Sequence, residues 1–315
     1  MALQTAHQPE VARAAALADV LSELGAARDR ELADDDGSSQ DGLDASSRLV
    51  HVAHLPERQA EYASLARPLP ASVAARLDRP MWSHQVAAID LVRSRRSVVV
   101  ATGTASGKSL CYQVPLAEAA VAPIRPGTGL ALFPTKALAH DQLRALTALG
   151  FPGVVAGAYD GDANPEERTW IRKHASVVLT NPEMLHAGLL PHHERWATFL
   201  GRLSYVVVDE LHAFRGVFGS HVAQLLRRLH RLALHHGADP VFICCSATIG
   251  APQRLASALT GVEVTSVVND GSPRGPRTIA LWQPPLLDAA SGTRASAHRE
   301  AAAVTAGLIR AGHTT

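Results

Sequence analysis

The sequence predicts a doubly wound α/β fold built on a parallel β-sheet. Six apolar runs recur along the 315-residue chain and are separated by stretches of helical periodicity. The runs are continuously apolar, which is typical of parallel strands that are buried on both faces. Strands that alternate with helices fit a sheet covered by helices on both sides. The predicted strands are residues 97–101, 128–133, 153–157, 175–180, 204–208 and 241–246.

Helix signals between these runs support the same fold. Pro165 and the two acids that follow it, Glu166 and Glu167, are typical of a first helical turn. Residues 219–229 repeat apolar side chains at spacings of three and four, which predicts an amphipathic helix. Both helices lie between predicted strands, as an alternating α/β chain requires.

The composition is that of a globular chain and limits its partners. Hydrophobic residues make up 47% of the chain, enough for a sizeable core, and a formal net charge of +1 gives no global basic field. Nucleic-acid binding would therefore need local patches. No run approaches the roughly 18 apolar residues of a membrane span, and the N-terminus lacks a secretory signal. These features predict a cytoplasmic location and no membrane partner.

The cysteines and histidines do not form a metal-binding pattern. Cys111, Cys244 and Cys245 lie in predicted helix or strand without metal-ligand spacing, which argues against a disulfide framework and against zinc. The 16 histidines include no pair at positions i and i+4 with a nearby carboxylate. We therefore predict no zinc in this chain.

Composition also divides the chain into three parts. Residues 1–47 combine a helical, alanine-rich stretch with an acidic segment that is poor in apolar residues, and are predicted to be a partly disordered extension. Residues 48–268 carry the alternating strands and helices. Residues 269–315 begin with the linker-like Asn269 to Pro276 and continue with a short strand at 278–282 and a helix near 295–312.

The turn after the first predicted strand is typical of a phosphate-binding loop. It ends in Gly107, Lys108 and Ser109, and a turn between a strand and a helix directs backbone N–H groups at phosphate oxygens. Lys108 would contact the β- and γ-phosphates, and Ser109 would hold Mg²⁺. The strict pattern has glycine where this chain has Thr102. The residues predicted to bind the nucleotide here are Thr104, Ala105, Ser106, Gly107, Lys108 and Ser109.

Two adjacent acids follow another predicted strand. Asp209 and Glu210 come directly after the apolar run at 204–208, and ligands bind at the carboxyl ends of strands in open α/β sheets. One carboxylate, Asp209, can hold Mg²⁺ while its neighbour orients or deprotonates the attacking water. Together with Lys108, these acids are the predicted catalytic residues of an ATP hydrolase.

Gln85 lies about twenty residues before the phosphate-binding loop. Its amide can donate and accept at once, which suits the N6/N7 edge of adenine. Taken alone, it would be an ordinary helix residue. Beside a phosphate-binding loop, it is predicted to bind the base.

Two further strand ends carry small polar residues and a lysine. Thr135 and Lys136 follow one predicted strand and open a helix, and Thr180 with Asn181 repeats the arrangement after another. Free N–H groups and a cation at such places suit a backbone phosphate of a nucleic acid. Each pair is equally explained as the capped start of a helix.

Ser246 and Thr248 close the last predicted strand. Hydroxyl residues there would lie near the acidic pair and could relay the state of the γ-phosphate. The order of the motifs along the chain, more than the three-residue match itself, carries this prediction.

From Gln85 to Thr248, the order of these elements resembles the first RecA-like lobe of superfamily 2 helicases of the DEAD/DEAH type, which are P-loop NTPases. In residues 101–109, 133–139 and 209–221 the sequence is similar to the mitomycin repair factor A type of bacterial DNA helicase and its RecQ4-like fungal relatives. The resemblance implies an ATP-dependent DNA helicase that moves 3′ to 5′ and acts in DNA repair, with ATP and Mg²⁺ as cofactors and DNA as a partner rather than RNA.

The resemblance also assigns roles to individual residues. It implies that Gln85 contacts adenine, that Lys108 and Ser109 contact phosphate and Mg²⁺, and that Asp209 and Glu210 contact metal and water. The residues implied to lie near a nucleic-acid strand are Thr135, Lys136, Thr180 and Asn181. The residues implied to couple the two sites are His212, Ser246 and Thr248.

Such motors need a second RecA-like lobe with an arginine-rich motif. The residues after Thr248 contain no Gln-x-x-Gly-Arg sequence, so residues 269–315 are predicted to be a linker and the start of an incomplete second lobe. Loss of an arginine finger typically lowers the rate by about 10³ to 10⁵. We expect this chain to bind ATP·Mg²⁺ and DNA weakly, to hydrolyse ATP slowly and not to unwind DNA alone.

Two other functions use the same motifs. One is a small-molecule kinase or signalling nucleotidase built on the same loop, and the other is a non-catalytic nucleic-acid-binding or regulatory module derived from a helicase. A kinase would ignore DNA, whereas a regulatory module would bind nucleic acid without turnover.

Overall fold

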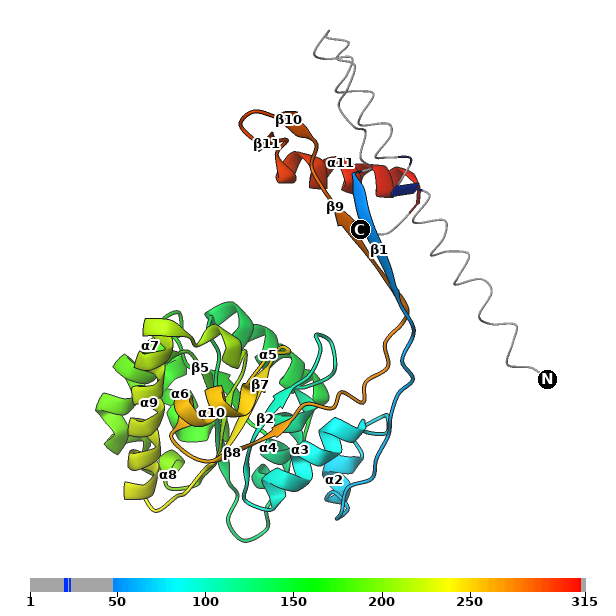
Figure 1. Cartoon of the computed structure of the whole chain (residues 1–315). Helices are drawn as coiled ribbons and strands as arrows, with labels where there is room; N and C mark the ends of the chain where they lie inside the picture. Colours follow the sequence, from blue (N-terminus) through cyan, green and yellow to red (C-terminus); the bar gives the residue numbers. More distant parts are fainter. Residues whose placement is uncertain (1–19, 22, 24–47, 313–315) are drawn as a thin grey trace, which may run out of the picture. The chain divides into compact units, whose positions relative to one another are not determined.

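The structure, a computed structural model, describes residues 48–312 together with Val20, Leu21 and Glu23. The rest of the predicted N-terminal extension and the last three residues lie outside this description. The described residues form two compact units (Figure 1). One contains residues up to Arg58 and from Arg274 onward, and the other runs from Gln59 to Pro273.

The larger unit contains a seven-stranded parallel sheet between two layers of helices (Figure 1). The strand order is β4-β5-β3-β6-β7-β2-β8, which confirms the predicted doubly wound parallel fold. The strands are β2 Ser97–Ala101, β3 Thr128–Leu132, β4 Ala156–Ala158, β5 Val177–Thr180, β6 Leu203–Val208, β7 Val241–Ser246 and β8 Val264–Val267.

The central strands are apolar because both faces of the sheet are buried. Val98 and Val100 of β2 pack into one core and Val99 packs into the other. Burial of such side chains stabilises the fold by about 1.5–3 kcal/mol each. The same alternation holds for β7, where Cys244 lies in one core and Cys245 in the other, both fully buried.

Two sets of helices cover the two faces. The helices on the face of Val98 are α2 Ala71–Ala74, α3 Ser83–Arg93, α4 Leu110–Ala120 and α5 Lys136–Leu149. The elements of the other layer and its connections are α6 Pro165–His174, α7 Pro182–Met184, η1 Leu185–Leu189, η2 Leu190–Trp196, α8 Ala197–Leu200, η3 Leu211–Ala213, α9 Gly216–His235 and α10 Pro252–Thr260. The predicted start of a helix at Pro165 is confirmed, with Asn164 and Glu167 forming a capping box before it.

The smaller unit pairs segments from distant parts of the chain. Strand β1 Leu49–Leu55 runs antiparallel to β9 Arg277–Trp282. The remaining elements are β10 Leu286–Asp288, β11 Thr293–Arg294 and α11 Ala297–Arg310. A buried ion pair joins Arg48 to Glu300 at 2.8 Å, and the indole of Trp282 donates to the same carboxylate at 3.1 Å.

This pairing differs from the predicted division of the chain. The sequence analysis placed 48–268 and 269–315 in different domains, whereas in the structure the chain divides after Arg58 and before Arg274. The pairing of β1 with β9 joins residues more than 200 positions apart, and such a contact cannot be predicted from local composition. Strand β8, Val264–Val267, was not predicted either, because Thr265 and Ser266 separate its two valines and leave no continuous apolar run.

No helix among the described residues has the length and apolar character needed to span a bilayer.

Candidate functional site

The predicted phosphate-binding loop and the acidic pair lie at one edge of the sheet. Residues 102–109 follow β2, and Asp209 with Glu210 follows β6. Strand β7 lies between these two strands and pairs with both. Because all strands are parallel, their carboxyl ends meet at the same edge. The structure therefore brings the two motifs to the same edge of the sheet, at the ends of two strands that are separated by β7 alone.

The loop leaves a run of backbone donors unused. Ala105 and Gly107 both take left-handed conformations, with φ of 60° and 64°. In the described part of the chain, the N–H groups of residues 104–109 have no acceptor. Helix α4 begins directly afterwards, so its positive dipole end adds to these donors. Such an arrangement is a ready anion site.

Thr102 stands at the position where the strict pattern has glycine, and its side chain cross-links the loop through a hydrogen bond. Its hydroxyl lies 2.7 Å from the hydroxyl of Ser106, which in turn donates to the carbonyl of Gly103 at 2.7 Å. The Nζ of Lys108 donates to the carbonyls of Gly103, at 2.6 Å, and Thr102, at 3.2 Å. A threonine here therefore adds a side-chain cross-link instead of disrupting the turn.

Gly107 is required by both its conformation and its surroundings. A Cβ at this position would lie 2.7 Å from Nε2 of Gln85 and 2.8 Å from the ring of Trp82, and φ is +64°. No other residue fits without displacement of these neighbours.

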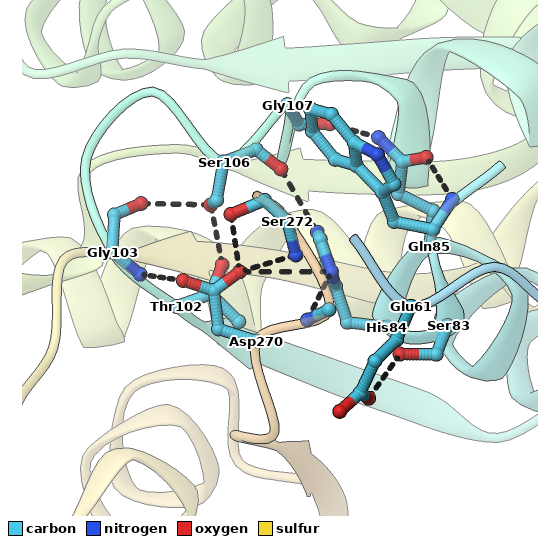
Figure 2. Close-up of polar contacts among 12 residues, drawn as sticks. Glu61, Ser83, His84, Gln85, Thr102, Gly103, Ser106, Gly107, Asp270 and Ser272 are labelled. Atoms are coloured by element: carbon cyan, nitrogen blue, oxygen red, sulfur yellow. Dashed lines mark hydrogen bonds and ion pairs between the residues drawn. The ribbon is translucent and has the colours of Figure 1, made fainter. Parts of the chain in front are cut away.

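The amide of Gln85 is engaged by the protein at both ends. Its Nε2 donates to the carbonyl of Gly107 at 3.0 Å, and its Oε1 accepts from the N–H of Trp82 at 2.9 Å (Figure 2). The residue is 2% exposed. In this arrangement Gln85 supports the loop and the first turn of α3. Its predicted contact with adenine stays a prediction, and that contact would require these bonds to exchange.

Tyr112 and Gln142 connect the loop to the acids, and no motif in the sequence singles out either residue. The hydroxyl of Tyr112 lies 2.7 Å from Oε1 of Gln142 and 3.3 Å from Oδ2 of Asp209. Ser109 donates to the same Gln142 oxygen at 3.1 Å. The two residues predicted to hold Mg²⁺, Ser109 and Asp209, are thus joined through two intervening side chains.

The two acids have different surroundings. Asp209 is buried, and burial raises its pKa to about 6, against the opposing effect of a 2.8 Å hydrogen bond from the N–H of Glu210. The neighbouring charge of Glu210 also raises this pKa. Glu210 itself is partly exposed and takes a left-handed conformation with φ of 50°, which is uncommon for a non-glycine residue.

His212 stands between the acids and the end of β7. Its Nδ1 lies 3.2 Å from Oε2 of Glu210 and 3.4 Å from the N–H of Ala247. The first contact needs a proton on Nδ1 and the second needs its lone pair, so one protonation state favours only one of them. Ser246 is fully buried, and its hydroxyl has no hydrogen-bond partner among the described residues. Thr248 is exposed.

The residues predicted to contact a nucleic acid lie mainly in helix caps. Thr135 accepts from the N–H of Leu138, and Asn181 accepts from that of Met184. Thr180 is buried and donates to the carbonyl of Tyr159.

Lys136 is the exposed cation of this set. Its Nζ lies 2.7 Å from Oδ1 of Asp162, and this hydrogen bond raises the pKa of the lysine. All four positions lie at the carboxyl edge, since Thr135 and Lys136 follow β3, Thr180 is the last residue of β5 and Asn181 follows it. Their role toward nucleic acid stays a prediction.

The fold and the loop define a P-loop NTPase of the RecA-like type. The sequence profile of the DEAD/DEAH box helicases matches residues 82–255. A crystal structure of the DUF1998 helicase MrfA bound to DNA is similar with a TM-score of 0.77 and 36% identity, over 89% of this chain and 39% of that one.

Two further relatives are helicases. The chain is 39% identical over 270 residues to the uncharacterized ATP-dependent helicase YprA of Bacillus subtilis, covering 82% of this chain and 35% of that protein. It is 39% identical over 273 residues to the ATP-dependent helicase HRQ1 of Saccharomyces cerevisiae, covering 84% and 25%. The chain belongs to the DEAD/DEAH box helicase family, as the motifs predicted. It spans about a third or less of the length of these two relatives.

Proposed function

We propose that this chain is the ATP-binding lobe of an ATP-dependent DNA helicase. The observation that carries the proposal is the link from Ser109 through Gln142 and Tyr112 to Asp209, which joins the loop to the acidic pair by hydrogen bonds. The family membership and the names of its relatives support ATP use. A further structure of MrfA, with DNA and AMPPNP, is similar with a TM-score of 0.76 over 89% of this chain.

The residues at the site fit Mg²⁺. The hydroxyl of Ser109 and the carboxylate of Asp209 are oxygen ligands of the kind that Mg²⁺ prefers. Burial raises the pKa of Asp209, which means that the surrounding protein groups offset only part of the cost of its negative charge. Bound between them, Mg²⁺ would neutralise charge on the phosphates.

The other residues of the site would bind the phosphates and activate the attacking water. The unused N–H groups of 104–109 would bind phosphate oxygens, and Lys108 would exchange its two carbonyl partners for the β- and γ-phosphates. Glu210 is partly exposed next to the buried Asp209, so it is the acid that could orient or deprotonate a water. His212 then provides a path from Glu210 to the end of β7.

We propose DNA as the nucleic-acid partner. Support comes from the relative whose crystal structure contains DNA. On this chain, Lys136 and the caps at Thr135 and Asn181 would lie along the strand, with Lys136 supplying the charge for a backbone phosphate. A 3′ to 5′ direction and a role in DNA repair belong to the same proposal and rest on the family resemblance. The cytoplasmic location stays a prediction.

A second RecA-like lobe is the proposed partner for full activity. The relatives YprA and HRQ1 are far longer than the region they share with this chain. We propose that the chain alone turns ATP over slowly, because the absence of an arginine finger typically lowers the rate of hydrolysis by a factor of about 10³ to 10⁵.

The test is ATP binding and turnover with and without DNA. The chain should bind ATP·Mg²⁺, and Lys108→Ala should weaken this binding strongly. Glu210→Gln should bind but not hydrolyse, and DNA should accelerate hydrolysis by the unchanged chain in a long single-turnover assay. Turnover that DNA does not change would favour a kinase or nucleotidase. Binding of DNA without any turnover would favour a regulatory module.

A further inference from the structure

The segment that follows β8 returns to the loop of residues 102–109. Figure 2 shows Asp270 beside Gly103, whose N–H donates to Oδ2 of the aspartate at 3.3 Å. The other carboxylate oxygen, Oδ1, accepts from the N–H of Ser272 at 3.0 Å and from its hydroxyl at 2.6 Å. Both oxygens of Asp270 are therefore used, one on the loop and one on its own turn.

His84 holds the other side of the loop. It is 1% exposed, and its Nε2 lies 2.9 Å from the carbonyl of Ser106 (Figure 2). Its Nδ1 accepts from the N–H of Gly271 at 3.2 Å and lies 3.9 Å from Oδ1 of Asp270. Because Nδ1 accepts, the proton is on Nε2 and is donated to Ser106. One imidazole thus joins the loop to the segment after β8.

The segment is also fixed from its far side. The N–H of Glu61 donates to the carbonyl of Gly271 at 2.9 Å, and the N–H of Ser83 donates to the carbonyl of Glu61 at 2.7 Å. A Cβ on Gly271 would lie 2.1 Å from the hydroxyl of Ser83 and 3.0 Å from the carbonyl of Glu61. The glycine is therefore packed against the start of α3, so residues 270–272 are held in place rather than forming a free linker.

We propose that His84 and Asp270 are positioning residues of the nucleotide site, and that residues 270–272 change their bonding when the loop binds a phosphate chain. The inference rests on the proposed ATP binding. The two residues hold the loop at Gly103 and Ser106, on both sides of Thr104 and Ala105. A loop held in advance loses less freedom when it binds a ligand.

Gly103 explains how the effect reaches Lys108. Its carbonyl accepts from Nζ of Lys108 at 2.6 Å, while its N–H is held by Asp270 at 3.3 Å. Lys108 also donates to the carbonyl of Thr102 at 3.2 Å, and this carbonyl belongs to the same peptide group as the N–H of Gly103. Departure of Lys108 toward a phosphate removes that partner and frees the Thr102–Gly103 peptide to rotate against Asp270. Coupling is reciprocal, so bonds that fix residues 270–272 must in turn alter affinity for the nucleotide.

The first experiment uses hydrogen exchange without nucleotide. Asp270→Ala should accelerate amide exchange of Gly103 and Ser272, whose N–H groups donate to this carboxylate, at least tenfold and leave the core strand β7 unchanged. His84→Phe keeps the ring volume and should accelerate exchange of Gly271, whose N–H donates to Nδ1 of His84, whereas His84→Gln keeps an acceptor for this N–H and should restore part of the protection. Asp141→Ala, which removes an exposed carboxylate on α5, is the matched control and should change nothing here. Unchanged exchange of Gly103 and Ser272 in Asp270→Ala would overturn the proposal.

The second experiment measures ATP·Mg²⁺ binding by calorimetry. Asp270→Ala and His84→Phe should each weaken binding about tenfold, and Lys108→Ala combined with Asp270→Ala should bind no more weakly than Lys108→Ala alone. ATP should change the exchange of residues 269–272 in the unchanged chain, and His84→Phe should abolish that response. Unaltered affinity in both variants, or additive losses in the double variant, would contradict the coupling.

The outcomes separate the two proposals. Absence of ATP binding by the unchanged chain overturns the proposed function, whatever the exchange data show. Intact ATP binding with no effect of either variant on exchange or affinity overturns only the roles of His84 and Asp270. If Asp270→Ala does not fold, Asp270→Asn keeps the side-chain shape and removes one acceptor, so the same two measurements apply to it.

Discussion

The two halves of the carboxyl edge of the sheet use their polar residues differently. In the half formed by β6, β7 and β2, polar side chains reach between elements, as Tyr112 does toward Asp209. In the half formed by β3, β5 and β4, Thr135 and Asn181 bond within their own turns as helix caps. Both halves show small polar residues after apolar strands in the sequence.

The difference shows what separates a ligand site from a capped helix. A cap satisfies its own helix start locally, which is the commonest use of Thr and Asn at such positions. In the loop of residues 102–109, the N–H groups of 104–109 have no acceptors in the described structure, and the side chains of Thr102 and Ser106 form a cross-link. Unused backbone donors, more than the type of side chain, therefore mark the half that is built to bind an anion.

The largest expected effect is on catalysis. Glu210→Gln should slow single-turnover ATP hydrolysis by about 10³-fold, because general-base catalysis contributes about 10² to 10⁴. Glu183→Gln alters the exposed acid after β5 in the other half and should leave the rate within twofold. Equal losses in both variants would remove the distinction between the halves.

The next effect is on stability, through two glycines with similar conformations. Gly107→Ala should lower the free energy of unfolding by about 3 kcal/mol, because left-handed strain adds to overlap with Trp82 and Gln85. Gly150→Ala ends α5 at φ of 59°, but its Cβ would lie no closer than 3.7 Å to Arg76, so it should cost only about 1 kcal/mol. Urea unfolding measures the free energy of unfolding of both variants. Similar decreases in the two would mean that the packing around Gly107 is loose enough to accept a Cβ.

A third effect depends on pH. Here the substitution is expected to raise the free energy of unfolding, whereas the glycine substitutions lower it. The folded pKa of Asp209, about 6, lies above its ordinary value of 3.8, so the folded state binds this proton more tightly than the unfolded state does. The ionised form therefore destabilises the fold above pH 6, and the penalty disappears as the pH falls from about 6 to about 4. Asp209→Asn should raise the free energy of unfolding by about 1–3 kcal/mol at pH 8, since one pKa unit corresponds to about 1.4 kcal/mol.

The measurement for Asp209 is urea unfolding at pH 8 and at pH 4.5. The advantage of Asp209→Asn should shrink at the lower pH, while ATP turnover is lost at both. A variant that is less stable at pH 8 would show that the carboxylate is compensated in the folded protein.

The smallest effect concerns Lys136. Lys136→Ala should weaken single-stranded DNA binding about threefold and reduce the salt slope by about one, as loss of one phosphate contact does. Asp162→Asn releases the lysine from its exposed ion pair and should strengthen binding slightly. Fluorescence anisotropy at two salt concentrations measures both variants, and unchanged binding by Lys136→Ala would exclude Lys136 from the DNA surface.

Much of the sheet could be predicted because its strands are continuously apolar. The predicted strands at 97–101 and 241–246 match β2 and β7 residue for residue. Strand β4 begins at Ala156 rather than 153, because Gly153 takes a left-handed conformation with φ of 73°. Periodicity gives no information on such a turn, and none on the pairing of β1 with β9.

The site was predictable where chain order carries the information. Chain order predicted that Lys108, Asp209 and Glu210 follow buried strands, and the structure places them after β2 and β6, while their catalytic roles stay predictions. His84 and Asp270 were missed as supports of the loop, since 167 residues separate Gly103 from Asp270 and the stretch around Gly271 has the composition of a linker. Tyr112 and Gln142 lie in ordinary helical sequence, and only the tertiary contacts single them out.

The burial of the cysteines has a practical consequence. The chain has three cysteines, all fully buried, and burial raises the pKa of Cys111 and Cys244 to about 12 and that of Cys245 well above its ordinary value. Thiols in this state react slowly with maleimides at neutral pH, because the thiolate is the reactive form. A thiol introduced at Val268, which is 52% exposed, would accept a fluorescent dye selectively without removal of the native cysteines.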